Sequence, residues 1–253
     1  MNDFEIFSQL HYQGTPLLLG NSWDVASAKL LAAKGFKAIA TSSAAVAITY
    51  GYEDGQHMPF DLLLETAVRI KKNINLPLSV DMERGYADTI PGILQNIERL
   101  VEAGVAGINI EDSVEERKLK SMESFQKIID AIANHLEKKN MQLFINARTD
   151  GYVVKLTNAL EESLKRIKAY ETAGASGIFV PFVTDIDDIR KITAATSLPV
   201  NIVSIKNLPS FKALTEAGIK RISLGSSLFR AMQRDLEKRV DNLLNEQSVD
   251  CLF

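Results

Sequence analysis

The sequence has few of the features that mark disulfide-stabilised, nucleic-acid-binding or membrane proteins. Its single cysteine, Cys251, excludes a disulfide framework and a zinc site built from several cysteines. Its 29 Lys and Arg nearly balance 32 Asp and Glu, the formal charge is −3, and no basic stripe is present, so nucleic acid and membrane surfaces are not expected partners. The most apolar window, residues 38–50, is interrupted by Thr and Ser and is too short to span a bilayer.

The composition is that of a protein that folds around a large core. Of 253 residues, 46% are hydrophobic and 24% are charged. We expect a single domain over residues 1–253, because α/β barrels and doubly wound sheets often have this length. Residues 1–9 include Asp3 and Glu5 and no apolar stretch of signal-peptide length, so a cytoplasmic location is expected.

Short apolar runs alternate along the chain with segments of helical period. The runs lie at residues 16–19, 38–41, 78–81, 107–111, 143–148, 177–181, 200–203 and 221–224. Between them apolar residues recur at helical spacing, as at Ile93, Ile97 and Leu100. The runs are apolar almost throughout, which predicts parallel strands covered on both faces.

A glycine turn precedes four of these runs. At Gly35, Gly104, Gly174 and Gly218 a helical segment ends, two residues turn, and a strand begins. The mean spacing of about 29 residues suits a repeated βα unit, so the sequence predicts a (β/α)8 TIM-type barrel, with a last helix over residues 227–245. The alternative is an open doubly wound sheet, which usually has a Gly-x-Gly-x-x-Gly first turn that this sequence lacks.

Acidic residues collect where two neighbouring predicted strands end, and barrel enzymes carry their chemistry at such positions. These residues are Asp81, Glu83, Glu111 and Asp112. Two carboxylates about 4 Å apart repel by about 4 kcal/mol at an effective dielectric of about 20, so the group either protonates or binds a cation. Oxygen ligands favour a hard ion, so we expect Asp81, Glu83 and Glu111 to bind Mg²⁺, with Mn²⁺ as the other choice. The alternative is that Asp81 or Asp112 only caps the following helix.

Arg148 ends the next predicted strand. A divalent ion and a guanidinium that face one cavity suit a small substrate with an oxygen beside a carboxylate, the metal binding the oxygen and the arginine the carboxylate. Asn201, on the seventh strand, is a further candidate for substrate contact. Arg148 could instead pair with Glu111 or Asp150, and this pairing is compatible with substrate binding.

Five motifs on successive predicted strands resemble those of the isocitrate lyase/phosphoenolpyruvate mutase superfamily, over about residues 14–235. They are Asn21-Ser22-Trp23-Asp24, Thr41-Ser42-Ser43-Ala44-Ala45, Val80-Asp81-Met82-Glu83-Arg84-Gly85-Tyr86, Asn109-Ile110-Glu111-Asp112-Ser113 and Asn146-Ala147-Arg148-Thr149-Asp150. The resemblance implies a Mg²⁺-dependent barrel that forms or cleaves C–C or P–C bonds beside a 2-oxo carboxylate, through an enolate.

The resemblance also implies roles for individual residues. Asp54, in the loop after the second strand, would add a metal contact. The backbone N–H groups of Ser43, Ala44 and Ala45 would bind the substrate carboxylate or enolate oxygen, and Trp23 would form a wall of the pocket. The residues expected to act in catalysis are Ser43, Glu111 and Arg148. Members of the superfamily are usually homo-oligomers that exchange their last helix, so a dimer or tetramer is expected here.

The sequence also departs from the superfamily pattern. Its lyases carry a Lys-Lys-Cys-Gly-His segment after the fourth strand, whose cysteine serves in proton transfer, whereas residues 114–121 here contain neither Cys nor His. The chain therefore resembles a subgroup that lacks this motif, and its general base is unassigned. The candidates are Tyr50, Asp54, Glu116 and Lys118.

We expect a Mg²⁺-dependent lyase that cleaves a C–C bond of a small 2-oxo or 2-hydroxy carboxylate, by retro-aldol cleavage or decarboxylation. One alternative is P–C bond chemistry on phosphonopyruvate, as a mutase or a hydrolase. Another is a barrel that binds a metabolite without catalysis, and the absence of the cysteine motif is the reason to consider it.

Overall fold

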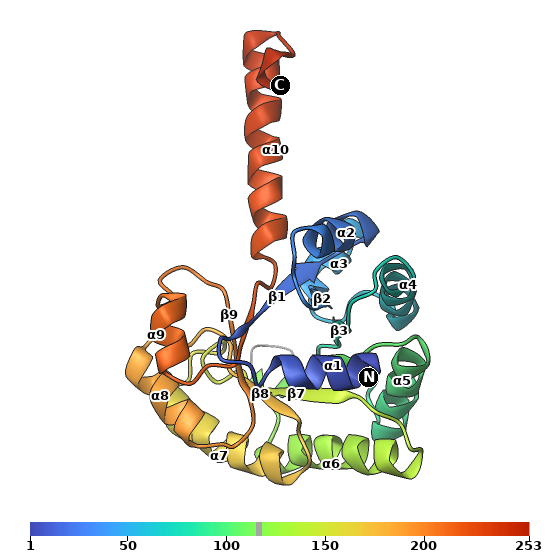
Figure 1. Ribbon diagram of the computed structural model, residues 1–253, viewed down its shortest axis with the longest axis vertical. Coiled ribbons are helices and arrows are strands. Elements are labelled where there is room, and N and C mark those ends of the chain that lie inside the picture. Colours follow the sequence, from blue (N-terminus) through green and yellow to red (C-terminus); the bar gives the residue numbers. More distant parts are fainter. Residues whose placement is uncertain (115–117, 253) are drawn as a thin grey trace.

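The computed structural model describes residues 1–114 and 118–252 as a closed barrel of eight parallel strands ringed by helices (Figure 1). Around the barrel the strands follow chain order, and the last strand pairs with the first. The predicted (β/α)8 barrel is therefore confirmed. The barrel strands are β1 (Leu17–Ser22), β2 (Ile39–Thr41), β3 (Leu78–Asp81), β4 (Gly107–Glu111), β7 (Phe144–Arg148), β8 (Gly177–Phe179), β9 (Val200–Val203) and β10 (Arg221–Ser223).

Helices precede, connect and follow the strands. They are α1 (Asp3–Leu10), α2 (Val25–Ala33), α3 (Ser43–Thr49), α4 (Phe60–Lys71), α5 (Ile90–Glu102), α6 (Met122–Lys138), α7 (Ala159–Thr172), α8 (Ile186–Ala194), α9 (Phe211–Glu216) and α10 (Ser227–Glu246). A 3-10 turn, Asp250–Leu252, follows α10. No helix of the described ranges is long and apolar enough to cross a membrane.

The eight predicted strand segments all correspond to barrel strands, and the four glycine turns are also confirmed. Gly35, Gly104, Gly174 and Gly218 all have positive φ, a region that costs glycine least because it has no Cβ. Two differences are local: β1 runs three residues further, to Ser22, and a short antiparallel hairpin follows β4. This hairpin is formed by β5 (Ser113–Val114) and β6 (Lys118–Leu119).

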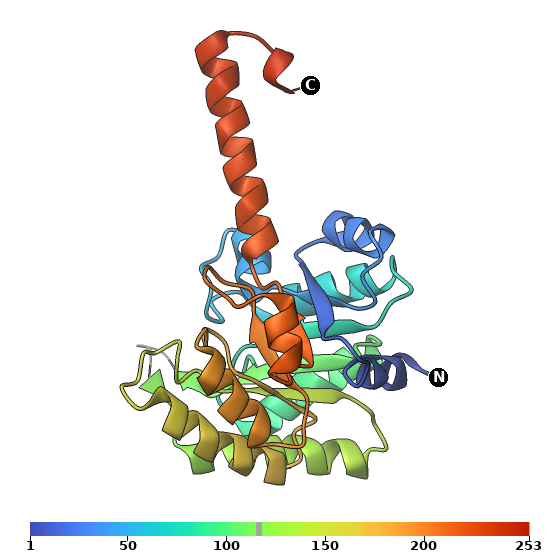
Figure 2. The same cartoon turned by 60° about the vertical axis from the view of Figure 1, so that its left-hand side comes forward.

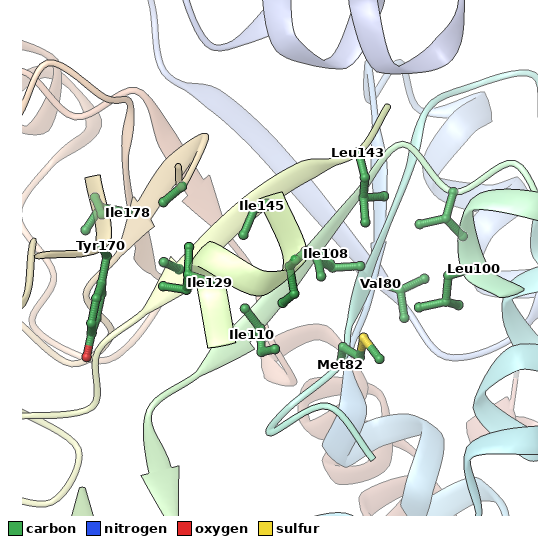
Figure 3. Packing of buried hydrophobic residues seen from close by; sticks show 14 of the residues in the cluster. Val80, Met82, Leu100, Ile108, Ile110, Ile129, Leu143, Ile145, Tyr170 and Ile178 are labelled. Atoms are coloured by element: carbon green, nitrogen blue, oxygen red, sulfur yellow. The ribbon is translucent and has the colours of Figure 1, made fainter. Parts of the chain in front are cut away.

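The barrel strands are parallel and buried on both faces, as predicted, but the two faces differ in chemistry. Val80, Ile108, Ile145 and Ile178 lie on β3, β4, β7 and β8 and pack in the large cluster with helix residues such as Ile129 (Figure 3). Alternate positions carry polar side chains that bond to one another across strands. Examples are the Asn146 Nδ2–Asn109 Oδ1 bond of 2.8 Å and the Ser223 Oγ–Asn201 Oδ1 bond of 3.0 Å.

Helix α1 precedes the first barrel strand, and helix α10 follows the last one. Phe7 and Leu10 of α1 are buried against Leu17, Leu19 and Phe144, so α1 packs against the residues that begin the barrel strands. In contrast, α10 projects away from the barrel, as both ribbon views show (Figures 1 and 2). Most of its side chains are therefore exposed.

Candidate active site

Asp81 is the last residue of β3 and one of its carboxylate oxygens is held by the helix that follows β2. Ser43 Oγ donates to Asp81 Oδ2 at 2.9 Å, and the Asp81 N–H donates to Thr41 Oγ1 at 2.9 Å. The other oxygen, Asp81 Oδ1, is buried and has no hydrogen-bond partner among the described residues. Such an acceptor is costly to bury unless a ligand or an ion completes its coordination.

Glu83 lies in the turn after β3 and is almost fully buried, with 4% of its surface exposed. Its φ of 47° is left-handed, and Tyr86 Oη donates to Glu83 Oε1 at 2.5 Å. Burial raises the pKa of Glu83 to about 8, and repulsion by Asp54, Asp81 and Glu111 adds to the rise. Its carboxyl group is therefore close enough to these acids to sense their charges.

Glu111 ends β4, in register with Arg148 at the end of β7. Arg148 Nη1 pairs with Glu111 Oε2 at 2.7 Å, and Ser113 Oγ donates to Glu111 Oε1 at 2.5 Å. Burial raises the pKa of Glu111 to about 7, against the lowering effect of Arg148, and Asp150 and Asp81 raise it further. A buried carboxylate that shares one guanidinium with another acid remains poorly neutralised.

Arg148 is held on two sides by acids. Its Nε and Nη2 atoms donate to the two carboxylate oxygens of Asp150 at 2.6 and 3.0 Å, in addition to its ion pair with Glu111. A guanidinium has five N–H donors, so these three contacts leave two for another anion. Arg148 thus pairs with both Glu111 and Asp150, the two partners that the sequence offered as alternatives. These ion pairs fix the plane of its guanidinium group.

Asp112 has a structural role, which differs from helix capping. Its Oδ2 accepts from Arg166 Nη1 at 2.9 Å and from Tyr170 Oη at 2.7 Å, and its Oδ1 accepts from the Asp150 N–H at 2.9 Å. The side chain is fully buried. Asp112 therefore ties the end of β4 to α7 and to the segment that carries Asp150, and it is separate from the acids that face Arg148.

Two segments that follow β2 lie near Asp81: the first turn of α3 and the loop after α3. Asp54 lies in the loop after α3. Partial desolvation of its carboxyl group, followed by repulsion from Asp81, raises its pKa, while Arg148 and Ser43 lower it. Ser43 and Ala44 lie in the first turn of α3, where N–H groups have no acceptor within the helix. The Ala45 N–H donates to the Ser42 side chain at 3.4 Å, so of the three predicted N–H donors this one already has a partner.

The carboxylates around Asp81 are of the hard-oxygen type that Mg²⁺ prefers, but they are not arranged as a closed cation site. In the ranges 1–114 and 118–252, no three Asp, Glu, His or Cys side chains are arranged as a metal-binding group. The mutual repulsion of Glu83, Glu111 and Asp81, and the unpartnered Asp81 Oδ1, both indicate a place where a cation would be stabilised. An ion at this place would need water among its ligands, as Mg²⁺ ordinarily keeps.

Trp23 and Asn201 lie outside this group of contacts. The Trp23 ring packs edge-to-face against Phe229 at the start of α10, with 5.0 Å between centroids. Asn201 is buried in the barrel, where its Oδ1 accepts from Ser223, and its Nδ2 has no partner among the described residues. Their predicted substrate contacts remain predictions.

The four candidates for the general base differ in position. Tyr50 Oη accepts from Thr66 Oγ1 at 3.2 Å, which places it between α3 and α4. Lys118 is exposed on β6, and Glu116 lies outside the described residues. Asp54 interacts electrostatically with both Asp81 and Arg148. Asp54 is therefore associated with the acid group around Asp81.

Sequence reasoning missed two residues that shape the site. Tyr86 binds Glu83, and its place three residues after an acid was the available signal. Arg221 is fully buried in the barrel and donates to Asn109 Oδ1 at 3.1 Å and to Ser223 Oγ at 3.2 Å. Burial lowers the pKa of Arg221 to about 9, and the nearby charge of Asp81 opposes that change. An arginine at the start of an apolar run gave no local sign of this position.

The fold and the site define a (β/α)8 barrel with an acid and guanidinium group at the carboxyl ends of neighbouring strands. Residues 7–244 match the family model described as phosphoenolpyruvate phosphomutase. The chain therefore belongs to this family, within the isocitrate lyase/phosphoenolpyruvate mutase superfamily, as the five motifs indicated.

Three similar proteins illustrate the range of the family. An uncharacterized protein of Mycobacterium tuberculosis is 34% identical over 225 residues, covering 89% of this chain and 83% of that protein. The 2-methylisocitrate lyase of Shewanella oneidensis is 29% identical, covering 95% and 85%. A solved structure from Burkholderia cenocepacia, provisionally named a phosphonomutase, superposes with a TM-score of 0.90 at 36% identity, covering 94% and 99%. The prediction of an enzyme is confirmed at the level of a lyase or mutase of this superfamily.

Proposed function

We propose that the protein is a Mg²⁺-dependent lyase that cleaves a C–C bond of a small 2-oxo or 2-hydroxy carboxylate. The observation that carries this proposal is the position of Arg148, which is oriented by Glu111 and Asp150 and lies within electrostatic reach of Asp81. A guanidinium beside a group of hard oxygen donors can bind one carboxylate in a fixed orientation. The likeness to a 2-methylisocitrate lyase supports the reaction class.

The metal would be held by Asp81, Glu83 and Glu111, with water among its ligands and Asp54 as an outer contact. A bound Mg²⁺ would supply Lewis-acid stabilisation of negative charge that develops on the substrate oxygen. Mn²⁺ offers the same chemistry, and the carboxylate donors accept either ion.

The protein's own groups perform three tasks in this proposal. Arg148 binds the substrate carboxylate through its two remaining N–H donors and so sets the direction of the scissile bond. The first-turn N–H groups of Ser43 and Ala44 add partial positive charge where an enolate oxygen would form. Asp54 transfers the proton, because its carboxyl group lies close enough to Asp81 and Arg148 for both charges to shift its pKa.

Calorimetric titration with oxalate, which imitates the enolate of pyruvate, tests the site. We expect oxalate to bind only when Mg²⁺ is present, and Glu111→Gln to weaken the binding of both the ion and oxalate. Glu137→Gln, an exposed position on α6, is the matched control. Metal-independent oxalate binding, or separate effects on the ion and on oxalate in Glu111→Gln, would contradict a shared site.

Turnover of a panel of oxaloacetate, isocitrate, methylisocitrate and dimethylmalate then tests the reaction. We expect Asp54→Asn to lower kcat while oxalate binding persists, because the proposed proton transfer is lost, whereas Arg148 and the three proposed metal ligands, Asp81, Glu83 and Glu111, remain. If the wild-type protein binds oxalate with Mg²⁺ but converts none of the panel, the metabolite-binding barrel without catalysis becomes the better description.

A second candidate is P–C bond chemistry on phosphonopyruvate. The 36% identity to a structure provisionally named a phosphonomutase favours it. The same Arg148 and acid group would bind the carboxylate end of this substrate. Phosphorus NMR distinguishes the candidates, since no loss of the phosphonate signal would exclude mutase and hydrolase activity together.

We further propose that the protein is a homo-oligomer in which α10 packs against a second copy. Leu228, Met232, Leu236, Val240 and Leu244 recur every four residues along this projecting helix and are all exposed. The outer side of α2 also exposes an apolar residue, Leu30, which lines a hollow together with Leu228 and Met232. Such an apolar stripe on a helix that leaves its own barrel needs a covering surface.

A further inference from the structure

Two segments beside the candidate active site share an unusual backbone conformation. In the turn after β3, Glu83 and Tyr86 have φ angles of 47° and 54°, and in the loop after α3, Gln56 has a φ angle of 65°. This left-handed region costs free energy for a residue that has a Cβ, and such residues persist where the surrounding contacts hold them. Contacts that hold this conformation in both segments therefore also hold Asp54 and Glu83, which the segments carry.

Two hydrogen bonds join the loop after α3 to the turn after β3. Arg84 Nη2 donates to the Gly55 carbonyl at 2.9 Å. The Tyr86 N–H donates to Gln56 Oε1. Tyr86 also donates through its hydroxyl to Glu83 Oε1 at 2.5 Å, so a single residue connects Gln56 to a proposed metal ligand.

The turn after β3 is also held by two helices. Asn96 Nδ2 of α5 donates to the carbonyls of Gly85 and Tyr86 at 3.1 and 3.0 Å. The Tyr86 ring packs against the ring of Phe60, the first residue of α4, with 5.9 Å between centroids. The turn therefore has supports of its own, and the loop after α3 is the segment that gains its position from the two bonds between them.

The loop after α3 has little backbone support near Asp54. Residues 53–58 belong to no helix or strand, and within the described ranges none of their N–H groups donates to a backbone carbonyl. The ends of the loop are fixed by the Tyr52 N–H, which donates to a carbonyl of α3 at 2.9 Å, and by Met58, which is buried. Between these ends the conformation depends on side-chain contacts, and Gln56 makes one of them two residues from Asp54.

We infer that Gln56 is a positioning residue, whose side-chain carbonyl fixes the loop after α3 to the turn after β3 and so holds the Asp54 carboxyl group beside Asp81. This inference rests on the proposed function, in which Asp54 transfers the proton, and it names the residue that keeps this group in place. Proton transfer requires hydrogen-bond reach, and a misplacement of about 1 Å can cost about 100-fold in rate. Gln56 therefore acts on the reaction through Asp54.

Hydrogen exchange of residues 51–59, followed by mass spectrometry in EDTA, tests this contact without substrate or metal. Gln56→Met keeps the length of the side chain and the left-handed backbone but removes the acceptor. We expect this segment to exchange about fivefold faster in Gln56→Met, the effect of losing one hydrogen bond that holds the loop closed. Gln56→Glu keeps an oxygen acceptor and should exchange like the wild type. Gln13→Met, at an exposed position after α1, is the matched control. Equal exchange in the wild type and Gln56→Met would overturn the inference.

Turnover of the same panel of substrates tests the link to Asp54. We expect Gln56→Met to lower kcat about tenfold with little change in KM, and Gln56→Glu to retain most of kcat. In the Asp54→Asn background, Gln56→Met should have no further effect, because the group that Gln56 positions is gone. An equal fall of kcat in both backgrounds would overturn the inference, since it would indicate a general structural role. A wild-type protein that converts none of the panel would refute the proposed function, whereas the exchange of residues 51–59 would still decide whether Gln56 holds the loop.

Discussion

Glu83→Gln is expected to remove much of the pH dependence of the stability of the metal-free protein. Burial, together with repulsion from three neighbouring acids, raises the pKa of Glu83 from 4.5 to about 8 in the folded state. The folded protein therefore retains a proton that the unfolded chain has released, and its free energy of unfolding falls as the pH rises from about 5 to about 8. At about 1.4 kcal/mol per pH unit, the Glu83 contribution reaches at most about 5 kcal/mol.

The glutamine variant preserves the local geometry while it removes the titration. The carbonyl oxygen of the new amide can still accept the hydrogen bond from Tyr86 that Glu83 accepts at 2.5 Å. Glu111, whose pKa is raised to about 7, contributes a slope of the same sign, so the variant should keep a smaller pH dependence. We therefore expect the variant to be more stable than the wild type near pH 8 and similar to it near pH 5.

Urea unfolding in EDTA at several pH values from about 5 to about 8 measures this effect. Glu137→Gln, on the exposed side of α6, controls for the loss of a glutamate. Adding Mg²⁺ near pH 8 should stabilise the wild type more than Glu83→Gln, because a ligand that binds the folded state shifts unfolding by mass action. Parallel stability curves for the wild type and Glu83→Gln would refute the assignment of a buried, mostly protonated Glu83.

Three further predictions concern single contacts. Asp112→Asn should destabilise the fold by about 1–3 kcal/mol in urea unfolding, since the buried Arg166 loses one of its two carboxylate partners and keeps only Glu162; an unchanged free energy of unfolding would contradict this role. Ser43→Ala removes the 2.9 Å bond to Asp81 and should weaken Mg²⁺-dependent oxalate binding by about 1 kcal/mol in calorimetry, whereas unchanged affinity would remove Ser43 from the site. Leu236→Glu should lower the mass measured by light scattering if α10 packs against another copy, and an unchanged mass would argue against that contact.

The positions of helices and strands followed from local sequence features. Apolar spacing, glycine turns and the repeat of about 30 residues are properties of short segments, so the βα units were visible without any long-range information. The same logic placed Asp81, Glu111 and Arg148 at strand ends. Because parallel strands in a barrel end at one rim, the approach of Glu111 to Arg148 could be predicted, and their 2.7 Å ion pair agrees with it.

The partners of the buried polar side chains depend on the tertiary structure. Asp112 and Arg166 are 54 residues apart, and Arg221 and Asn109 are 112 apart, so no local pattern could pair them. Asp112 follows the predicted metal ligand Glu111 directly in sequence, but in the fold its carboxylate accepts hydrogen bonds from Arg166 and Tyr170 of α7. Local sequence sets the conformation of each segment, whereas the pairing of buried charges depends on which segments the closed fold brings together.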